Sequence, residues 1–213
     1  LIKKLKKSKK IKLKLIVTGA HLNKLFGSTI NEIIKDKNKI FYKIKINQSN
    51  IKPEKTYLQS SKIISSFSKL FLKHRPDLIM ILGDRFEIFS VAIAAVFNNF
   101  PIAHLYGGEV TEGSMDEIFR HSITKMSNYH FVSTERSKKR VRQLGENPKN
   151  IFLVGSLGVE NIKKINLISR SELAKKLNIN FEKKNIMFSY HPERNNSKIV
   201  SNLKNIFLAL KSL

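Results

Sequence analysis

The strongest constraint on the fold is an alternation of short apolar runs with longer amphipathic segments, which begins near residue 11. Strands that alternate with helices of about 10–15 residues are typical of βαβ units on a parallel sheet. The run 78–82 is apolar at each position, as expected for a strand that helices cover on both faces. The pattern therefore predicts an α/β fold, a Rossmann-like parallel sheet with helices on both of its faces.

The apolar runs and the amphipathic segments define the expected elements. Strands are predicted at residues 12–18, 40–46, 77–82, 101–105, 130–133, 151–154 and 185–190. Helices are predicted at residues 28–35, 57–73, 87–98, 116–127, 135–144, 171–177 and 197–210. Before the first strand, the apolar residues change from helical spacing to alternation, which indicates the end of a helix that runs into this strand.

The expected domain boundary lies between residues 157 and 170, where a Gly-containing turn leads into a polar stretch. Residues 1–165 are expected to form an N-terminal Rossmann-like domain. Because the chain opens in mid-element and without Met, we expect this domain to lack its first strand. Residues 166–213 are expected to begin a second α/β domain that the chain does not complete.

Lysine dominates the charge: 40 Lys and Arg against 16 Asp and Glu give a formal net charge of +24. Such a charge first indicates a nucleic-acid-binding module. However, only eight of the basic residues are Arg, whose fork favours phosphates and base edges. The Lys excess accompanies abundant Asn and Ile, so A/T-rich codons explain most of it. Nucleic-acid binding therefore stays a remote alternative, and no nucleic-acid partner is expected.

Several other classes are disfavoured by what the sequence lacks. It has no Cys, which excludes thiol catalysis, disulfides and Cys-based zinc sites. It also has no His-Glu-x-x-His, clustered Asp box, dinucleotide fingerprint or P-loop, so neither a metal nor a cofactor is expected. Without a signal peptide or an apolar run near the ~20 residues of a membrane span, we expect no membrane partner and a cytoplasmic location.

Polar residues that follow the apolar runs are the candidates for a site, because ligands bind at the carboxyl ends of strands in a doubly wound sheet. Gly83 follows the run 78–82 and permits a sharp turn, after which Asp84 and Arg85 place an acid or base beside an anion-binding group. The alternative is that Asp84 only caps the following helix. Capping alone would not require the adjacent Arg85.

A second candidate is the segment that follows the strand at 101–105. His104 precedes a loop in which Gly107 and Gly108 permit close backbone approach to a ligand, and Glu109 and Glu112 supply carboxylates. A bare Gly-Gly turn would be weak evidence. The histidine before it, the two acids after it and a loop too long for a hairpin favour a site.

Two further candidates lie later in the chain. Asp116 opens a helix in which Arg120 and His121 could bind a phosphate or carboxylate. The alternative is a solvated helix face with an i,i+4 ion pair between Asp116 and Arg120. This alternative does not explain the presence of His121. His191 follows the strand at 185–190 and could transfer protons or contact phosphate in a cleft between two domains. A lone histidine is more often incidental.

These segments resemble the hydrolysing UDP-N-acetylglucosamine 2-epimerases of sialic and legionaminic acid synthesis. The resemblance covers nearly the whole chain in the right order. It rests on LGDRFE (82–87), HLYGGEVTEG (104–113), DEIFRHSITK (116–125), VGSLGVEN (154–161), VTGAHL (17–22) and YHPE (190–193). It implies a two-domain GT-B-like architecture, with the sugar nucleotide in the cleft between the domains. It also implies that Asp84 and Asp116 are catalytic carboxylates and that Arg85 and His191 contact UDP.

One position departs from the family pattern. Several relatives carry a catalytic Glu where this chain has Tyr106. Tyr106 marks either a branch with a different substrate or proton-transfer arrangement, or a protein in which Glu109 takes part of the role. The residue before Gly83, often His in relatives, is Leu82 here.

The implied reaction removes the C2 proton while the nucleotide leaves C1, and water then adds to release UDP and a 2-epimeric N-acetylated sugar. Acid and base roles are assigned to Asp84, Glu109, Asp116 and His191. Binding of substrate or UDP is assigned to Arg85, Arg120, His121, Tyr106, Gly107, Gly108 and His21. The alternatives are a non-hydrolysing epimerase and a GT-B glycosyltransferase. We expect the full-length protein to be a homo-oligomer and residues 1–213 alone to be inactive.

Overall fold

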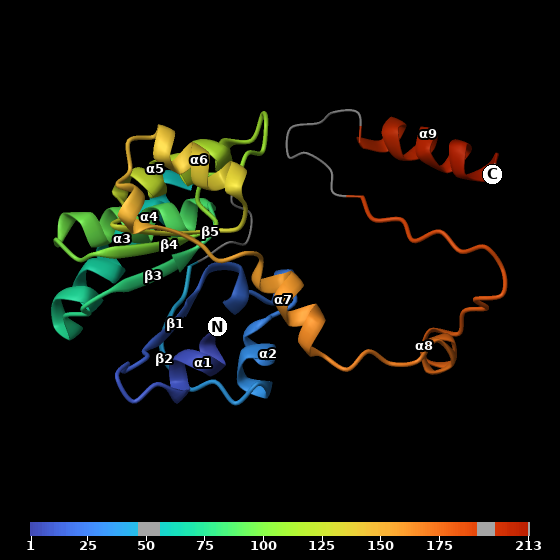
Figure 1. The fold of residues 1–213 in the computed structure, drawn as a ribbon, viewed down its shortest axis with the longest axis horizontal. Coiled ribbons are helices and arrows are strands. Elements are labelled where there is room, and N and C mark those ends of the chain that lie inside the picture. The colour runs from blue at the N-terminus through green and yellow to red at the C-terminus, as the bar shows by residue number, and fades with distance from the viewer. Residues whose placement is uncertain (47–55, 191–198, 213) are drawn as a thin grey trace. The chain divides into compact units, whose positions relative to one another are not determined.

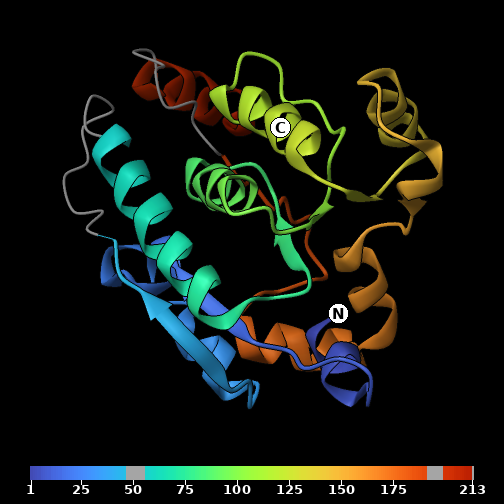
Figure 2. The same cartoon turned by 90° about the vertical axis from the view of Figure 1, so that its left-hand side faces the viewer.

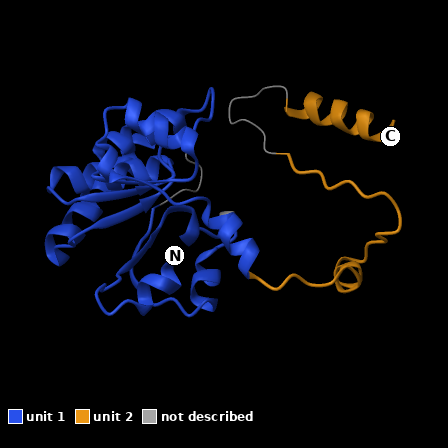
Figure 3. Ribbon diagram, viewed as in Figure 1, with its two compact units in different colours: residues 1–164 blue, residues 165–213 orange. Residues whose placement is uncertain are grey.

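The computed structural model describes residues 1–46, 56–190 and 199–212 (Figure 1). The chain divides into two compact units, residues 1–164 and residues 165–213 (Figure 3). The first unit contains every described strand, and the candidate residues up to Arg120 and His121 lie in it.

The described strands of the first unit are all parallel and short. They are β1 (Leu15–Thr18), β2 (Ile40–Ile44), β3 (Ile79–Leu82), β4 (Ile102–Leu105), β5 (Tyr129–Val132) and β6 (Ile151–Leu153). β1 pairs with β2, and β3, β4, β5 and β6 form a second sheet in that order. Within the described residues, β1 pairs with β2 alone. On its outer side, away from β4, β3 pairs with no described strand.

The helices of the first unit follow or precede these strands. They are α1 (Ile2–Lys7), α2 (Ile30–Lys35), α3 (Thr56–His74), α4 (Phe86–Phe97), α5 (Met115–Met126), α6 (Glu135–Gln143) and α7 (Leu157–Lys164), with short 3-10 turns at Gly19–Leu22, Lys24–Phe26 and Pro148–Asn150. The parallel α/β architecture predicted from the alternating pattern is confirmed. The helix α7 was not predicted, because its glycine and polar residues indicated a turn.

The main core forms where α3 and α4 pack against β3 and β4. Helix α3 buries Ile63, Phe67 and Phe71, and α4 buries Ala92 and Ala95 in the same cluster. Small alanine side chains let neighbouring helices approach closely, and α4 contacts both α3 and α5 (Figure 2). The tight packing makes this half of the unit a rigid support for the loops at the strand ends.

A smaller cluster supports the other side of the second sheet. Helix α6 is mostly charged and buries only Ser137 and Val141, and Val141 packs with Val132 and Ile151. The side chain of Thr134 accepts a hydrogen bond from the Ser137 amide at 3.1 Å, which caps the start of the helix. Helix α6 therefore begins at a defined point directly after β5.

The second unit holds α8 (Arg170–Leu177) and α9 (Ile199–Lys211), and neither has a buried residue. The prediction of a strand at 185–190 is wrong, because these residues are described without a ladder. The apolar residues of that run have the composition of a strand, but a strand forms only where a second strand completes its hydrogen bonds. The predicted domain boundary and the identity of this unit as a second α/β domain stay predictions.

Candidate functional site

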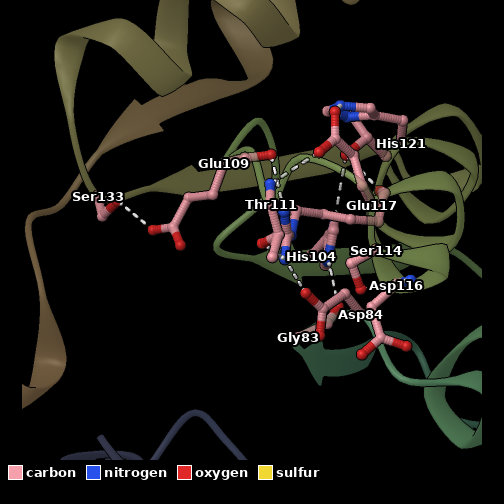
Figure 4. Close-up of polar contacts among 12 residues, drawn as sticks. Gly83, Asp84, His104, Glu109, Thr111, Ser114, Asp116, Glu117, His121 and Ser133 are labelled. Carbon is pink, nitrogen blue, oxygen red and sulfur yellow. Dashed lines mark hydrogen bonds and ion pairs between the residues drawn. The ribbon is translucent and has the colours of Figure 1, made fainter. Parts of the chain in front are cut away.

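The candidate residues gather at the carboxyl ends of β3 and β4, because these strands are parallel neighbours in register from Ile79 and Ile102 onward. The turn after β3 carries Asp84, and the loop after β4 carries Glu109. Figure 4 shows both segments with the start of α5, which carries Asp116. These residues thus come together at one edge of the sheet, as the strand-end rule predicts.

Arg120 connects the three segments. Its guanidinium is buried and forms an ion pair with Asp84, while Nη1 donates to the backbone oxygen of Glu109 at 2.9 Å and Nη2 to Thr111 Oγ1 at 3.1 Å. Charge-assisted bonds from one planar group hold several segments in a fixed geometry. The guanidinium is turned to Asp84 rather than to Asp116, one helical turn before it. A contact between Arg120 and a diphosphate stays a prediction.

The candidate carboxylates differ in what holds them. Asp84 accepts from Arg120, and its side chain keeps partial exposure. Asp116 is half-buried in the first turn of α5, where its amide donates to Ser114 Oγ at 3.2 Å. That bond caps α5. The helix that follows Asp84 is α4, whose N-cap residue is Arg85 and whose start has no side-chain capping hydrogen bond, so the alternative that Asp84 only caps this helix is not supported.

Glu109 faces an open cleft. Its Oε1 accepts a hydrogen bond from Ser133 Oγ at 2.6 Å. The cleft has a volume of about 540 Å³, and Glu112, Arg136 and Arg140 also line it. A carboxylate with one anchored oxygen beside two cations is suited to proton transfer near an anionic substrate.

Tyr106 is held differently from Glu109. Its φ is +67°, which a bulky residue adopts at a cost of order 1–3 kcal/mol. Its amide donates to the Phe131 oxygen at 2.9 Å, and its hydroxyl accepts from the amide of Leu157 at 2.7 Å. Leu157 is the first residue of α7. The tyrosine therefore links the loop after β4 to the start of that helix.

Gly107 and Gly108 are required by the protein's own packing. A Cβ at Gly107 would lie 2.9 Å from Thr124 Oγ1, and one at Gly108 would lie 2.5 Å from the Ser137 backbone oxygen. The Gly108 oxygen also accepts a hydrogen bond from Arg140. The glycines were predicted to allow the approach of a ligand, and the structure shows that they allow the approach of α5 and α6.

His104 lies beneath the site with no exposed surface. Its Nε2 is 2.9 Å from the Gly83 oxygen, and its Nδ1 is 3.3 Å from Thr124 Oγ1. Burial lowers the pKa of His104 to about 4, although the hydrogen bond to Gly83 opposes this shift. Sequence reasoning named this histidine as part of the motif and gave it no role.

Two basic side chains, of an arginine and a histidine, lie at the margins of the site. Arg85 is about half exposed, with 47% of its side-chain surface accessible, and it binds the buried Glu87 carboxylate through two hydrogen bonds of 3.0 and 3.1 Å. His121 lies 3.7 Å from Glu117 Oε1, and Glu117 Oε2 accepts from the Thr111 amide at 2.7 Å. Of the described polar atoms, His121 Nδ1 is one that is buried without a partner.

Two candidates are not brought into this cluster. His21 lies after β1, in the other sheet, and its Nδ1 is 2.7 Å from Thr29 Oγ1 in its own segment. His191 lies outside the described residues. Within residues 1–46, 56–190 and 199–212, no group of three or more His, Cys, Asp and Glu could hold a metal ion. The same described ranges contain no helix long and apolar enough to cross a bilayer.

Comparison with known proteins gives three consistent matches. A family model described as UDP-N-acetylglucosamine 2-epimerase matches residues 3–213. The chain is 42% identical over 91% of its length to polysialic acid biosynthesis protein P7 of Escherichia coli. It is 41% identical over 96% of its length to the hydrolyzing GDP/UDP-N,N'-diacetylbacillosamine 2-epimerase of Campylobacter jejuni. These matches cover 49% and 52% of the relatives, so the chain spans about half the length of the curated relatives it matches.

The fold has counterparts among solved structures. The crystal structure of UDP-GlcNAc 2-epimerase from Neisseria meningitidis, bound to UDP-GlcNAc, matches with a TM-score of 0.65 at 21% identity. The match covers 83% of this chain and 48% of that one. This likeness shows the fold and confirms the predicted GT-B-like architecture. Because the family model spans nearly the whole chain, the chain belongs to the UDP-N-acetylglucosamine 2-epimerase family.

Proposed function

We propose that the protein to which this chain belongs is a hydrolysing nucleotide-sugar 2-epimerase. The observation that carries the proposal is the fixed carboxylate of Asp84, held by the buried Arg120 at the strand edge where Glu109 also lies. The family supports it, and so does the C. jejuni relative, whose name describes a hydrolyzing 2-epimerase.

The reaction needs a base for a weakly acidic C–H bond. As the C2 proton is taken, the C1–O bond breaks and the electron pair leaves with UDP, which creates a glycal-like double bond. Water then adds its OH to C1, and a proton returns to C2 from the opposite face. Asp84 and Asp116 are proposed for the C2 proton transfers, and Glu109 for the water step.

The departing diphosphate needs positive charge nearby. Arg85 is proposed to bind the diphosphate, because its side chain is half exposed while Glu87 holds the guanidinium in place. Arg120 is proposed to act mainly on Asp84, since its donors are occupied by protein atoms. His121 and Tyr106 are proposed to lie against the substrate, while the roles of His21 and His191 stay predictions.

The substrate is proposed to be a UDP-linked N-acetylated sugar. The names of the relatives include a diacetamido sugar and UDP-GlcNAc, so both belong in the assay. The place in sialic or legionaminic acid synthesis, the cytoplasmic location and the homo-oligomeric state stay predictions.

The test is a product analysis with the full-length protein. In water enriched in both ¹⁸O and deuterium, the proposal expects UDP and a free 2-epimeric sugar that carries ¹⁸O at C1 and deuterium at C2. An intact epimerised nucleotide sugar would establish the non-hydrolysing reaction instead. Consumption of an added acceptor together with the nucleotide sugar would establish a glycosyltransferase. Asp84→Asn should abolish the turnover, and an active variant would remove Asp84 from the proposed role.

A further inference from the structure

Two buried histidines lie side by side on neighbouring strands. His104 of β4 and His130 of β5 are direct partners in the register of the sheet, and both are almost completely buried. His130 has its Nε2 3.2 Å from Glu146. His104 instead contacts the turn that carries Asp84. His104 thus contacts the candidate site, whereas the equally buried His130 contacts Glu146 instead.

The contacts of His104 belong to a closed circuit. Its Nε2 lies 2.9 Å from the Gly83 oxygen, and the next residue, Asp84, is bound by Arg120. The backbone oxygen of Arg120 is 3.0 Å from Thr124 Oγ1, which lies 3.3 Å from Nδ1 of the same histidine. Figure 4 shows His104, Gly83 and Asp84 next to one another. The circuit joins β4, the turn after β3 and α5.

The protonation state of His104 follows from these partners. The Gly83 oxygen has no hydrogen to donate, so the proton of a neutral ring must be on Nε2. Nδ1 is then left as an acceptor, and the single hydroxyl hydrogen of Thr124 goes either to Nδ1 or to the Arg120 backbone oxygen. With its pKa lowered to about 4, chiefly by burial, the ring is neutral at pH 7.

At Gly83 itself, the contact with His104 is the shorter of the two hydrogen bonds that hold the turn. Gly83 has a φ of +92°, and a Cβ built on it would meet no atom within 4 Å. Its amide reaches the Leu105 oxygen at 3.3 Å, which is a long hydrogen bond. The carbonyl side of the turn is anchored by His104. Side-chain packing does not replace this anchor.

We propose that His104 is a positioning residue that holds the Gly83 carbonyl, and through it the carboxylate of Asp84, in the geometry the reaction needs. The proposal rests on the function proposed above, in which Asp84 acts on the substrate. His104 itself has no exposed surface and touches no substrate.

Three variants of the full-length protein separate the two ring nitrogens. In His104→Gln the amide nitrogen takes the place of Nε2 and can still donate to Gly83. In His104→Asn the amide group reaches only the position of Nδ1, and His104→Leu supplies neither contact. We expect kcat to fall by about 100-fold in the Asn and Leu variants, with KM changed by less than about threefold, and the Gln variant to recover most of kcat.

His130→Asn is the matched control. It removes an equally buried imidazole from the adjacent strand, at the position that contacts Glu146. The proposal expects a loss of stability in this variant with kcat unchanged. Equal kcat losses in His130→Asn and His104→Asn would show a general effect of core disruption and would overturn the proposal.

A spectroscopic measurement keeps the proposal testable if a variant does not fold. The ¹⁵N shifts of His104 in the wild-type protein should report a neutral ring with its proton on Nε2 at pH 7. A proton on Nδ1, or a charged ring, would overturn the proposal. If the wild-type protein shows no epimerase activity, the proposed function fails. If it is active and the Asn and Leu variants match its kcat, only this inference fails.

Discussion

Replacement of Gly108 by alanine would test how closely the loop after β4 packs against α6. The new Cβ would lie 2.5 Å from the Ser137 backbone oxygen and 2.8 Å from Val141 Cγ2, closer than real Cβ contacts. The oxygen belongs to the helix backbone and cannot rotate away, so the loop or α6 must shift. The residue also has a φ of +79°, which disfavours any side chain.

The magnitude follows from adding the two costs. The left-handed backbone costs about 1–2 kcal/mol for alanine, and overpacking of a tight contact costs about 1–3 kcal/mol. The free energy of unfolding should therefore fall by about 2–5 kcal/mol in Gly108→Ala. Two other glycines separate the costs. Gly113 has a φ of +76° with open space around it, whereas Gly107 has the close contact without a positive φ.

Urea denaturation of the three variants beside the wild type is the assay. Gly113→Ala should lose only the backbone cost, about 1–2 kcal/mol, and Gly107→Ala only the contact cost, about 1–3 kcal/mol. The reasoning is refuted if Gly108→Ala is no less stable than Gly113→Ala, because the contact with α6 would then cost nothing.

Two further predictions concern His104 and Tyr106. Because the pKa of His104 falls from 6.5 to about 4 on folding, the unfolded chain binds a proton in this window that the folded chain does not. This contribution to the free energy of unfolding is complete above pH 6.5, and about 2 kcal/mol of it is lost by pH 5. Urea denaturation above pH 6.5 and at pH 5 should therefore show a smaller loss of stability in His104→Gln than in the wild type. An equal loss in the two proteins would contradict the lowered pKa of His104. Tyr106→Phe removes the acceptor of the Leu157 amide, so hydrogen exchange of that amide should accelerate, with Tyr129→Phe as the exposed control. Unchanged exchange at Leu157 would show that the hydroxyl does not hold α7.

Much of the fold was predictable because short segments of the sequence carry the hydrophobic pattern of the strand or helix that they form. The apolar run at 78–82 and the amphipathic segments around it indicated a parallel sheet, and the β3 and α4 that form there agree with that reading. The strand predicted at 185–190 does not form, and its residues alone could not show this, because a strand needs a partner strand to complete its hydrogen bonds. Helix α7 was missed because its glycine indicated a turn.

The place where the candidate residues meet was predictable from the sequence, and their contacts were less so. Asp84 follows a strand, and the strand-end rule was sufficient to find it. Nothing in the pattern of α5 shows that Arg120 turns to Asp84, which lies 36 residues earlier, and not to Asp116 within its own helix. His104 was counted in the motif but was given no role, because nothing in the sequence shows that its ring reaches the turn at Gly83. The glycine three positions later was the available signal, since its missing Cβ makes room for that ring.

The outer side of β3 has a practical consequence for handling this chain. Among the described residues no strand pairs there, and Met80 and Leu82 are 39% and 49% exposed. An edge strand with unpaired peptide groups beside apolar side chains can pair with any extended segment, including one from another copy. Residues 1–213 prepared alone should therefore self-associate as their concentration rises. Dilute samples, or a soluble fusion partner, would be needed before any of the stability measurements is interpreted.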